Sequence, residues 1–262
     1  MSLFDRPDPR RLDLRASLRA LHENWLVRVN RQRAGVAVRA IVDVSASMAF
    51  GSQRPKLHVV ADFLEALGLS AFRVGDAVGM MAFDTSERSD LFMPARMSRG
   101  MGSIMASAVR AVSDSASVRG TAPGPGRTEH NVVVNGLEEA ASHLAGQQGL
   151  VFVVSDFHWP LQRLSSVLDL LAHASVVPVV VWDPAETNPP ERNALAALRD
   201  AESGARRTLW VRPKLRQDWR QAVIRRRAEI DSLFASRGLQ TFYIEGAFDA
   251  DALSRYFFEA ET

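Results

Sequence analysis

Oxygen-bearing side chains occur where two apolar runs of this sequence end. Asp43, Ser45 and Ser47 alternate with apolar residues at the end of one run, and Asp156 follows another. In an extended backbone alternate residues point the same way, so the first three side chains share one side of the chain. Ligands of open parallel sheets bind beyond the carboxyl ends of the strands. We therefore expect these residues to meet at one edge of a sheet, together with Thr128, which opens a later predicted helix.

Carboxylates and hydroxyls are hard oxygen donors, and this set contains no softer ligand. It favours Mg²⁺, with Mn²⁺ or Ca²⁺ as alternatives, over zinc or copper. Two carboxylates and three hydroxyls leave coordination positions for water and for one carboxylate of a partner protein. Such residues also serve as helix caps or turn residues, so the prediction depends on all five occurring together. The predicted cation ligands are Asp43, Ser45, Ser47, Thr128 and Asp156.

Apolar strands that alternate with amphipathic helices must position these side chains. Strand-like runs occur at 37–44, 76–84, 149–156 and 175–183, and an edge strand stopped by Pro94 is expected at 88–97. Helical spacing of apolar residues occurs at 55–73, 100–116, 128–146 and 161–174. Strands that are apolar throughout are buried on both faces. The pattern predicts an α/β fold with a central, mostly parallel sheet, one antiparallel edge strand and helices on both faces.

The final third of the chain is expected to continue this pattern after a β-hairpin. The hairpin is predicted at 194–211, because Gly204 supplies a turn and the residues after it favour a strand. A helix at 214–237, a strand at 239–244 and a short helix at 249–259 are expected to follow. The stretches 118–127 and 183–193 are rich in proline or glycine and are predicted to be flexible loops.

The segment 41–48, with the sequence IVDVSASM, resembles the Asp-x-Ser-x-Ser motif of von Willebrand factor A (VWA) domains. The resemblance extends to Thr128 and to Asp156, and it implies a VWA fold with a metal-ion-dependent adhesion site. In that site Ser45, Ser47 and Thr128 would touch the metal directly, whereas Asp43 and Asp156 would act mostly through water. Thr121 is the alternative to Thr128, which follows an arginine instead of the usual small residue.

Two further segments resemble a narrower VWA family. These are 10–29, RRLDLRASLRALHENWLVRV, and the DAESG turn at 200–204. They are similar to VWA proteins whose genes accompany MoxR-type AAA+ ATPases, among them the MxaS proteins of methanol-oxidation operons. The resemblance implies an adaptor that works with a MoxR-type ATPase in maturation of, or metal insertion into, an acidic client enzyme, with methanol dehydrogenase as one candidate. The expected organisation is a basic extension at 1–34 and a VWA-like domain at 35–262 with the hairpin as an insertion.

Positive charge is concentrated in two parts of a nearly neutral chain. The net charge is +2, yet residues 1–40 carry +5 and residues 205–227 carry +8. A solvated helix face is enough to explain the second segment, and a docking surface for an acidic protein is the main functional alternative. Nucleic acid fits less well, because aromatic residues do not interleave with the cations. The predicted partner-binding residues are Met48, His158, Arg216 and Arg220.

Missing motifs narrow the function further. The chain has no cysteine, no His-Glu-x-x-His, no Gly-x-Ser-x-Gly and no lysine in a phosphate-binding loop. The alternatives left open are a nucleic-acid-binding protein and a metal-dependent phosphoester hydrolase that uses His130, His158 or Glu129 as its base. The longest apolar run has seven residues, against about 20 for a membrane span. Without a visible signal peptide, a cytoplasmic protein with no membrane span is expected.

Overall fold

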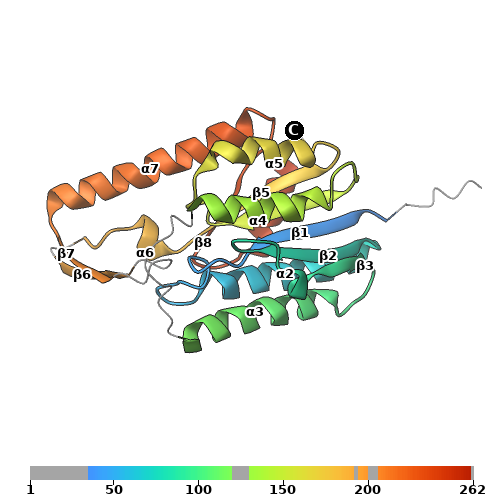
Figure 1. The fold of residues 1–262 in the computed structure, drawn as a ribbon, viewed down its shortest axis with the longest axis horizontal. Helices are drawn as coiled ribbons and strands as arrows, with labels where there is room; N and C mark the ends of the chain where they lie inside the picture. Colours follow the sequence, from blue (N-terminus) through green and yellow to red (C-terminus); the bar gives the residue numbers. More distant parts are fainter. Residues whose placement is uncertain (1–34, 120–129, 192–193, 200–205, 261–262) are drawn as a thin grey trace, which may run out of the picture. The chain divides into compact units, whose positions relative to one another are not determined.

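The computed structural model describes residues 35–119, 130–191, 194–199 and 206–260. Its main sheet has six strands in the order β3-β2-β1-β4-β5-β8 (Figure 1). The strands are β1 Ala37–Asp43, β2 Ala77–Phe83, β3 Met93–Arg96, β4 Leu150–Ser155, β5 Ser175–Trp182 and β8 Phe242–Glu245. All neighbours pair in parallel except β2 and β3. The predicted α/β sheet, mostly parallel with one antiparallel edge strand, is confirmed.

Helices cover both faces of this sheet (Figure 1). On one face the core includes side chains of α2 Lys56–Val74, α3 Met101–Arg119 and α8 Ala250–Ala260. On the other face it includes side chains of α4 His130–Ser142, α5 Leu164–Leu170 and α7 Pro213–Ala235. The central strands are apolar throughout because they lie between these two layers. No helix in the described ranges is both long and apolar enough to cross a membrane.

The predicted hairpin is present as a separate two-stranded sheet. β6 Ala194–Arg199 pairs antiparallel with β7 Arg206–Val211, and α7 follows almost at once. The proposed division between an extension at 1–34 and a domain at 35–262 stays a prediction, because residues 1–34 lie outside the described part of the chain.

Three predicted segments differ from the structure. The edge strand expected at 88–97 is a 3₁₀ turn, η2 Ser89–Leu91, followed by the four-residue β3. Pro94 does not stop this strand but lies within it, as an edge strand permits. The helix expected at 161–174 begins as a 3₁₀ turn, η3 Leu161–Arg163, and α5 ends at Leu170. The loop expected at 183–193 opens instead with a short helix, α6 Pro184–Thr187, which is fixed by a capping box.

Candidate metal centre

The two predicted carboxylates follow neighbouring parallel strands. Asp43 is the last residue of β1, and Asp156 comes directly after β4. The register pairs Val42 with Val154, which brings the ends of these strands together. Both carboxylate side chains are fully buried. The expectation that strand order would bring these two positions side by side is therefore confirmed.

Asp43 is a buried carboxylate surrounded by neutral hydrogen-bond donors. Its Oδ1 accepts the backbone N–H of Ser45 at 2.9 Å, and its Oδ2 accepts the hydroxyl of Ser155 at 2.6 Å and the indole N–H of Trp159 at 3.4 Å. Among the described residues no cationic side chain pairs with it. Burial and the charge of Asp156 raise the pKa of Asp43 from 3.8 to about 6. A cation at this place would relieve both effects.

Two hydroxyls lie beside these carboxylates. The Oγ atoms of Ser45 and Ser47 are 3.2 Å apart in the turn between β1 and α2. A hydrogen bond from Ser47 also lowers the pKa of Asp156. Met48, predicted to contact a partner, lies instead fully buried in the core. The turn brings it there by folding back onto α2, where the N–H of Leu57 donates to the Met48 carbonyl at 3.0 Å.

The sequence analysis missed a buried lysine within this centre. Lys56 opens α2, and its side chain is 2% exposed. Its Nζ donates to Asp156 Oδ2 at 2.7 Å and to Glu186 Oε1 at 2.8 Å. Burial alone would lower the pKa of Lys56, but the two carboxylates raise it. A signal was available, because the chain otherwise uses arginine and has just one other lysine.

Lys56 also determines the protonation state of Asp156. Burial alone would raise the pKa of this carboxyl, yet the ammonium of Lys56 and the imidazole of His158 hold it well below its usual range. The backbone N–H of His158 donates to Asp156 Oδ1 at 3.1 Å. Asp156 is thus an ionised carboxylate whose charge Lys56 compensates, whereas the charge of Asp43 is not compensated in this way.

Glu186 reaches the centre because α6 is capped. The N–H of Asp183 donates to Glu186 Oε2 at 2.9 Å, while Asp183 accepts the N–H groups of Ala185 and Ser52, each at 2.8 Å. His158 Nε2 lies 3.7 Å from Glu186 Oε2. Ligand atoms of Asp156, His158 and Glu186 all lie within 4.8 Å of one another, a spacing that could hold a metal ion. The Lys56 ammonium, however, already bonds to two of these three residues.

The loop that carries Asp156 is anchored from α7. Phe157 has a φ of 51°, which is rare for a residue with a bulky side chain. The guanidinium of Arg226 donates to the carbonyl oxygens of Phe157 and Trp159. The indole N–H of Trp182 donates to the Asp156 carbonyl at 2.9 Å. These bonds from α7 and β5 fix the direction in which the Asp156 side chain points.

Replacing Arg226 with Met should lower the free energy of unfolding by about 1.5–3 kcal/mol, because two carbonyls lose a charged donor. Urea unfolding monitored by tryptophan fluorescence would measure the loss. Arg225→Met is the matched control, since that side chain is exposed on the same helix, and its effect should stay within about 0.5 kcal/mol. Equal losses in the two variants would contradict the anchoring role.

The structure brings together four of the five predicted ligands: Asp43, Ser45, Ser47 and Asp156. Thr128, its alternative Thr121 and Glu129 lie outside the described residues. His130 begins α4. The His158 side chain is 41% exposed at the rim of the centre. On α7, Arg216 is half-buried and Arg220 is exposed.

Comparison with known proteins identifies relatives but no assigned function. Residues 7–229 match the family described as "Protein of unknown function DUF58". Uncharacterized proteins of Mycobacterium bovis and of two Mycobacterium tuberculosis strains are 25% identical over 226 residues. These matches cover 85% of the chain but 66% of each relative, so the chain spans slightly less than two thirds of their length.

Two solved structures are similar at low identity. One is the conserved hypothetical protein BatB from Bacteroides thetaiotaomicron, with a TM-score of 0.47 and 15% identity, covering 87% of this chain and 99% of that one. The other is an aerotolerance-related membrane protein from Bacteroides fragilis, with a TM-score of 0.43 and 16% identity, covering 87% and 98%.

Proposed function

We propose that this chain, which belongs to the DUF58 family of proteins of unknown function, is a VWA-type binding module. It binds Mg²⁺, or Mn²⁺ or Ca²⁺ in its place, and through that cation an acidic protein client. The ligand set is Asp43, Ser45, Ser47 and Asp156, with Thr128 as the fifth member. A MoxR-type AAA+ ATPase is the proposed working partner, in maturation of, or metal insertion into, that client.

The buried, uncompensated charge of Asp43 is the observation that supports this proposal most. A carboxylate without a cationic partner is costly inside a protein. Ser45 and Ser47 follow it by two and four residues, and their hydroxyl oxygens are 3.2 Å apart. Carboxylate and hydroxyl oxygens without sulfur or imidazole in this group are ligands that magnesium and calcium prefer. The residues present therefore fit a hard divalent cation.

The hydrogen bonds around the carboxylates indicate how each ligand would act. Both oxygens of Asp43 already accept protein donors, and so do both oxygens of Asp156. These two side chains are thus suited to hold a cation through its water molecules. The Ser45 and Ser47 hydroxyls retain lone pairs for direct contact. Since Lys56 compensates one carboxylate, the centre offers a cation little negative charge, and a carboxylate from a partner would add what is missing.

A phosphoester hydrolase has less support. Of the three predicted bases, His158 alone has a described side chain. Burial opposes its protonation, but the charge of Asp156 outweighs burial and raises the pKa of His158. In the cation-free protein, a raised pKa disfavours the neutral imidazole that a general base requires. The arrangement therefore favours a binding module over a hydrolase.

Calorimetric titration with Mn²⁺ and with Mg²⁺ tests the proposal. The wild type should bind one cation, and Ser47→Ala should bind it at least about 10–100-fold more weakly, the loss usual even for outer partners of metal ligands. Ser52→Ala is the control, because this exposed serine of the same loop contributes its backbone N–H alone. A wild type that binds no cation, with or without an added acidic peptide, would overturn the proposal.

The partner is tested separately. The purified chain should co-elute with a MoxR-type ATPase from the same organism when Mg²⁺ is present, and the complex should dissociate in EDTA. Co-elution that is equally strong in EDTA would show that the interaction does not depend on the cation.

A further inference from the structure

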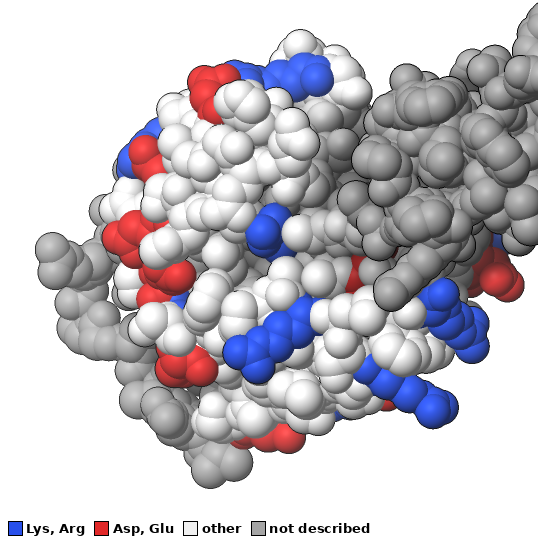
Figure 2. Space-filling model, turned by 90° about the vertical axis from the view of Figure 1, so that its right-hand side faces the viewer, with Lys and Arg blue, Asp and Glu red and all other residues white. Residues whose placement is uncertain are grey.

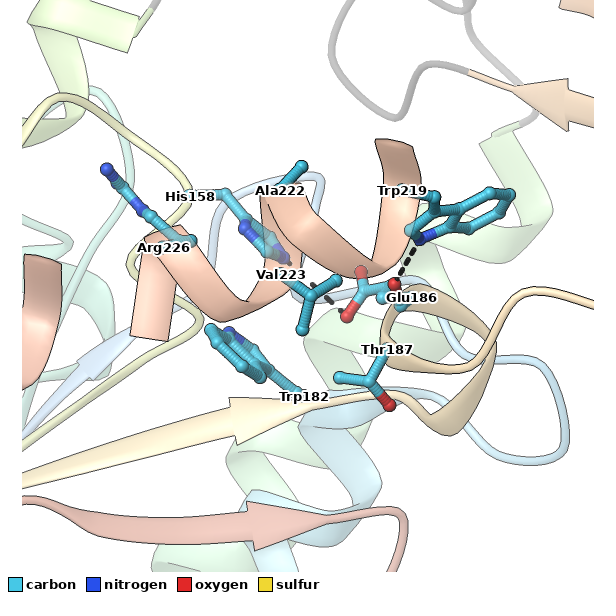
Figure 3. Close-up of a pocket in the computed structure, with 8 residues that line it drawn as sticks. All are labelled: His158, Trp182, Glu186, Thr187, Trp219, Ala222, Val223 and Arg226. Carbon is cyan, nitrogen blue, oxygen red and sulfur yellow. Dashed lines mark hydrogen bonds and ion pairs between the residues drawn. The ribbon is translucent and has the colours of Figure 1, made fainter. Parts of the chain in front are cut away.

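A small apolar pocket lies beside the candidate centre. It encloses about 220 Å³ between α7, α6 and the end of β5. Figure 3 shows Val223 of α7 between Trp182 and Glu186, with His158 at one side. The His158 ring stacks on Trp182 with centroids 6.1 Å apart and planes 4° apart. Two indole rings and the aliphatic side chain of Val223 thus supply apolar surface to the wall.

The polar atoms of this wall already have partners. The indole N–H of Trp219 donates to the Glu186 carbonyl at 2.7 Å, and that of Trp182 donates to the Asp156 carbonyl at 2.9 Å. The Glu186 carboxylate accepts Lys56 and the N–H of Asp183. What the pocket presents to a ligand is therefore ring faces and methyl groups, so an apolar group fits it best.

The size of the pocket limits the ligand. Sites for drug-sized molecules and cofactors usually enclose about 300–1,000 Å³. A volume of about 220 Å³ instead suits one bulky side chain, such as the anchor residues that fill pockets at the centres of protein interfaces. The volume therefore favours one residue of a longer chain over a free small molecule.

Charge indicates what kind of chain that is. Over 213–227, α7 carries six cations and one acid, Asp218. The cations are Lys214, Arg216, Arg220, Arg225, Arg226 and Arg227. Figure 2 shows the end of the molecule at which β1 begins. By contrast with α7, acidic and basic side chains are mixed over the described part of that face. Among the described helices, α7 carries the largest net positive charge, and it forms one wall of the pocket, so charge complementarity favours an acidic segment.

We propose that this pocket binds a phenylalanine or leucine side chain of an acidic partner segment, whose neighbouring carboxylate reaches the cation. His158 and Glu186 line the pocket, and Lys56 links Glu186 to Asp156, so the pocket and the candidate centre share one wall. One short segment therefore reaches both. The carboxylate contact rests on the proposed function, whereas the apolar contact does not.

Two acidic peptides that differ in one residue test the inference. Each has the form acetyl-Asp-Glu-X-Glu-Asp-amide, with X either phenylalanine or alanine, and is titrated against the full chain in Mg²⁺ by calorimetry. The phenylalanine peptide should bind at least about tenfold more tightly, since it buries a ring that alanine lacks. Ala222→Trp, which fills the pocket from an exposed position on α7, should abolish the difference.

Ala228→Trp is the matched control, because Ala228 is exposed on the same helix and does not line the pocket. It should preserve the preference for phenylalanine, and both variants should bind Mg²⁺ as the wild type does. A wild type that binds Mg²⁺ and both peptides equally well would overturn the inference and leave the proposed function intact. A wild type that binds Mg²⁺ but neither peptide at millimolar concentration would overturn the inference and also count against an acidic client.

The inference can also hold while the proposed function fails. A preference for phenylalanine that Ala222→Trp removes, in a protein that binds no cation, would support the pocket and contradict the proposed function. Oligothymidylate binding more tightly than either peptide, and lost in Ala222→Trp, would overturn the inference in favour of a nucleic-acid base in the pocket.

Discussion

Asp43→Asn should abolish the response of the protein to divalent cations and yet make the cation-free protein more stable. In the wild type, a cation present at 100 times its dissociation constant should add about 2.7 kcal/mol of stability. For a chain of this size that corresponds to a rise in melting temperature of about 5–11 °C. Asparagine has the shape of aspartate but not its charge, so the variant should show no such rise.

The gain in stability without a cation has its own cause. The pKa of Asp43 is raised from 3.8 to about 6, so ionising this group costs the folded state free energy. A raised pKa in the folded state means that the stability this group contributes is present at low pH and is lost as the pH rises through 6. The advantage of Asp43→Asn should therefore grow between pH 4 and pH 7, to the order of 1–3 kcal/mol.

Thermal melting with and without Mn²⁺, at several pH values, checks both parts. Asp76→Asn is a suitable control, because Asp76 accepts the N–H of Val36 at the opposite edge of the sheet. It should keep the full response to Mn²⁺. An Asp43→Asn variant that still melts at a higher temperature in Mn²⁺ would exclude Asp43 from the centre.

Lys56→Met should produce the largest loss of stability. The substitution leaves the carboxylates of Asp156 and Glu186 without the ammonium that lies 2.7 and 2.8 Å away. Breaking a buried ion pair by removing one partner costs about 3–5 kcal/mol. Because a divalent cation would restore positive charge beside Asp156, the variant should also gain more stability from Mn²⁺ than the wild type does.

Denaturant unfolding measures the loss, and Lys214→Met provides the control, since Lys214 is exposed at the start of α7. If the cost comes from unpaired charge, the double variant Lys56→Met, Glu186→Gln should be more stable than Lys56→Met alone. A Lys56→Met protein as stable as the wild type would show that the ion pair does not hold the centre together.

The parts of the centre that could be predicted are those carried by strand ends. Asp43 and Asp156 are 113 positions apart in the sequence, yet each ends an apolar run, and parallel strands place such ends at one edge. The turn after β1 was predictable because its oxygen-bearing side chains follow the end of the same apolar run. Local pattern did not reveal that Met48 lies inside, because a turn residue becomes buried only when the turn folds back onto the next helix.

The rarity of lysine marks Lys56 as unusual, but the ion pair between Lys56 and Glu186 could not be predicted, because it depends on a contact between distant segments. They are 130 positions apart and meet only when α2 and α6 reach the same edge of the sheet. The start of α6 could have been predicted, since aspartate followed three residues later by glutamate is a helix-capping pattern. The prolines nearby instead suggested a flexible loop, and so the position of Glu186 was missed.

Because Lys56 is buried, the rate at which its amine reacts can report how often the candidate centre opens. Lysine occurs at two positions in the sequence, and of these Lys214 is exposed whereas Lys56 is 2% exposed. An acylating reagent will modify Lys214 quickly, but Lys56 only in molecules whose centre has opened. The rate of Lys56 acylation, followed by mass spectrometry, therefore reports the free energy of local opening, as amide exchange does for the backbone. Any cation or partner that stabilises the closed centre will therefore slow the acylation of Lys56.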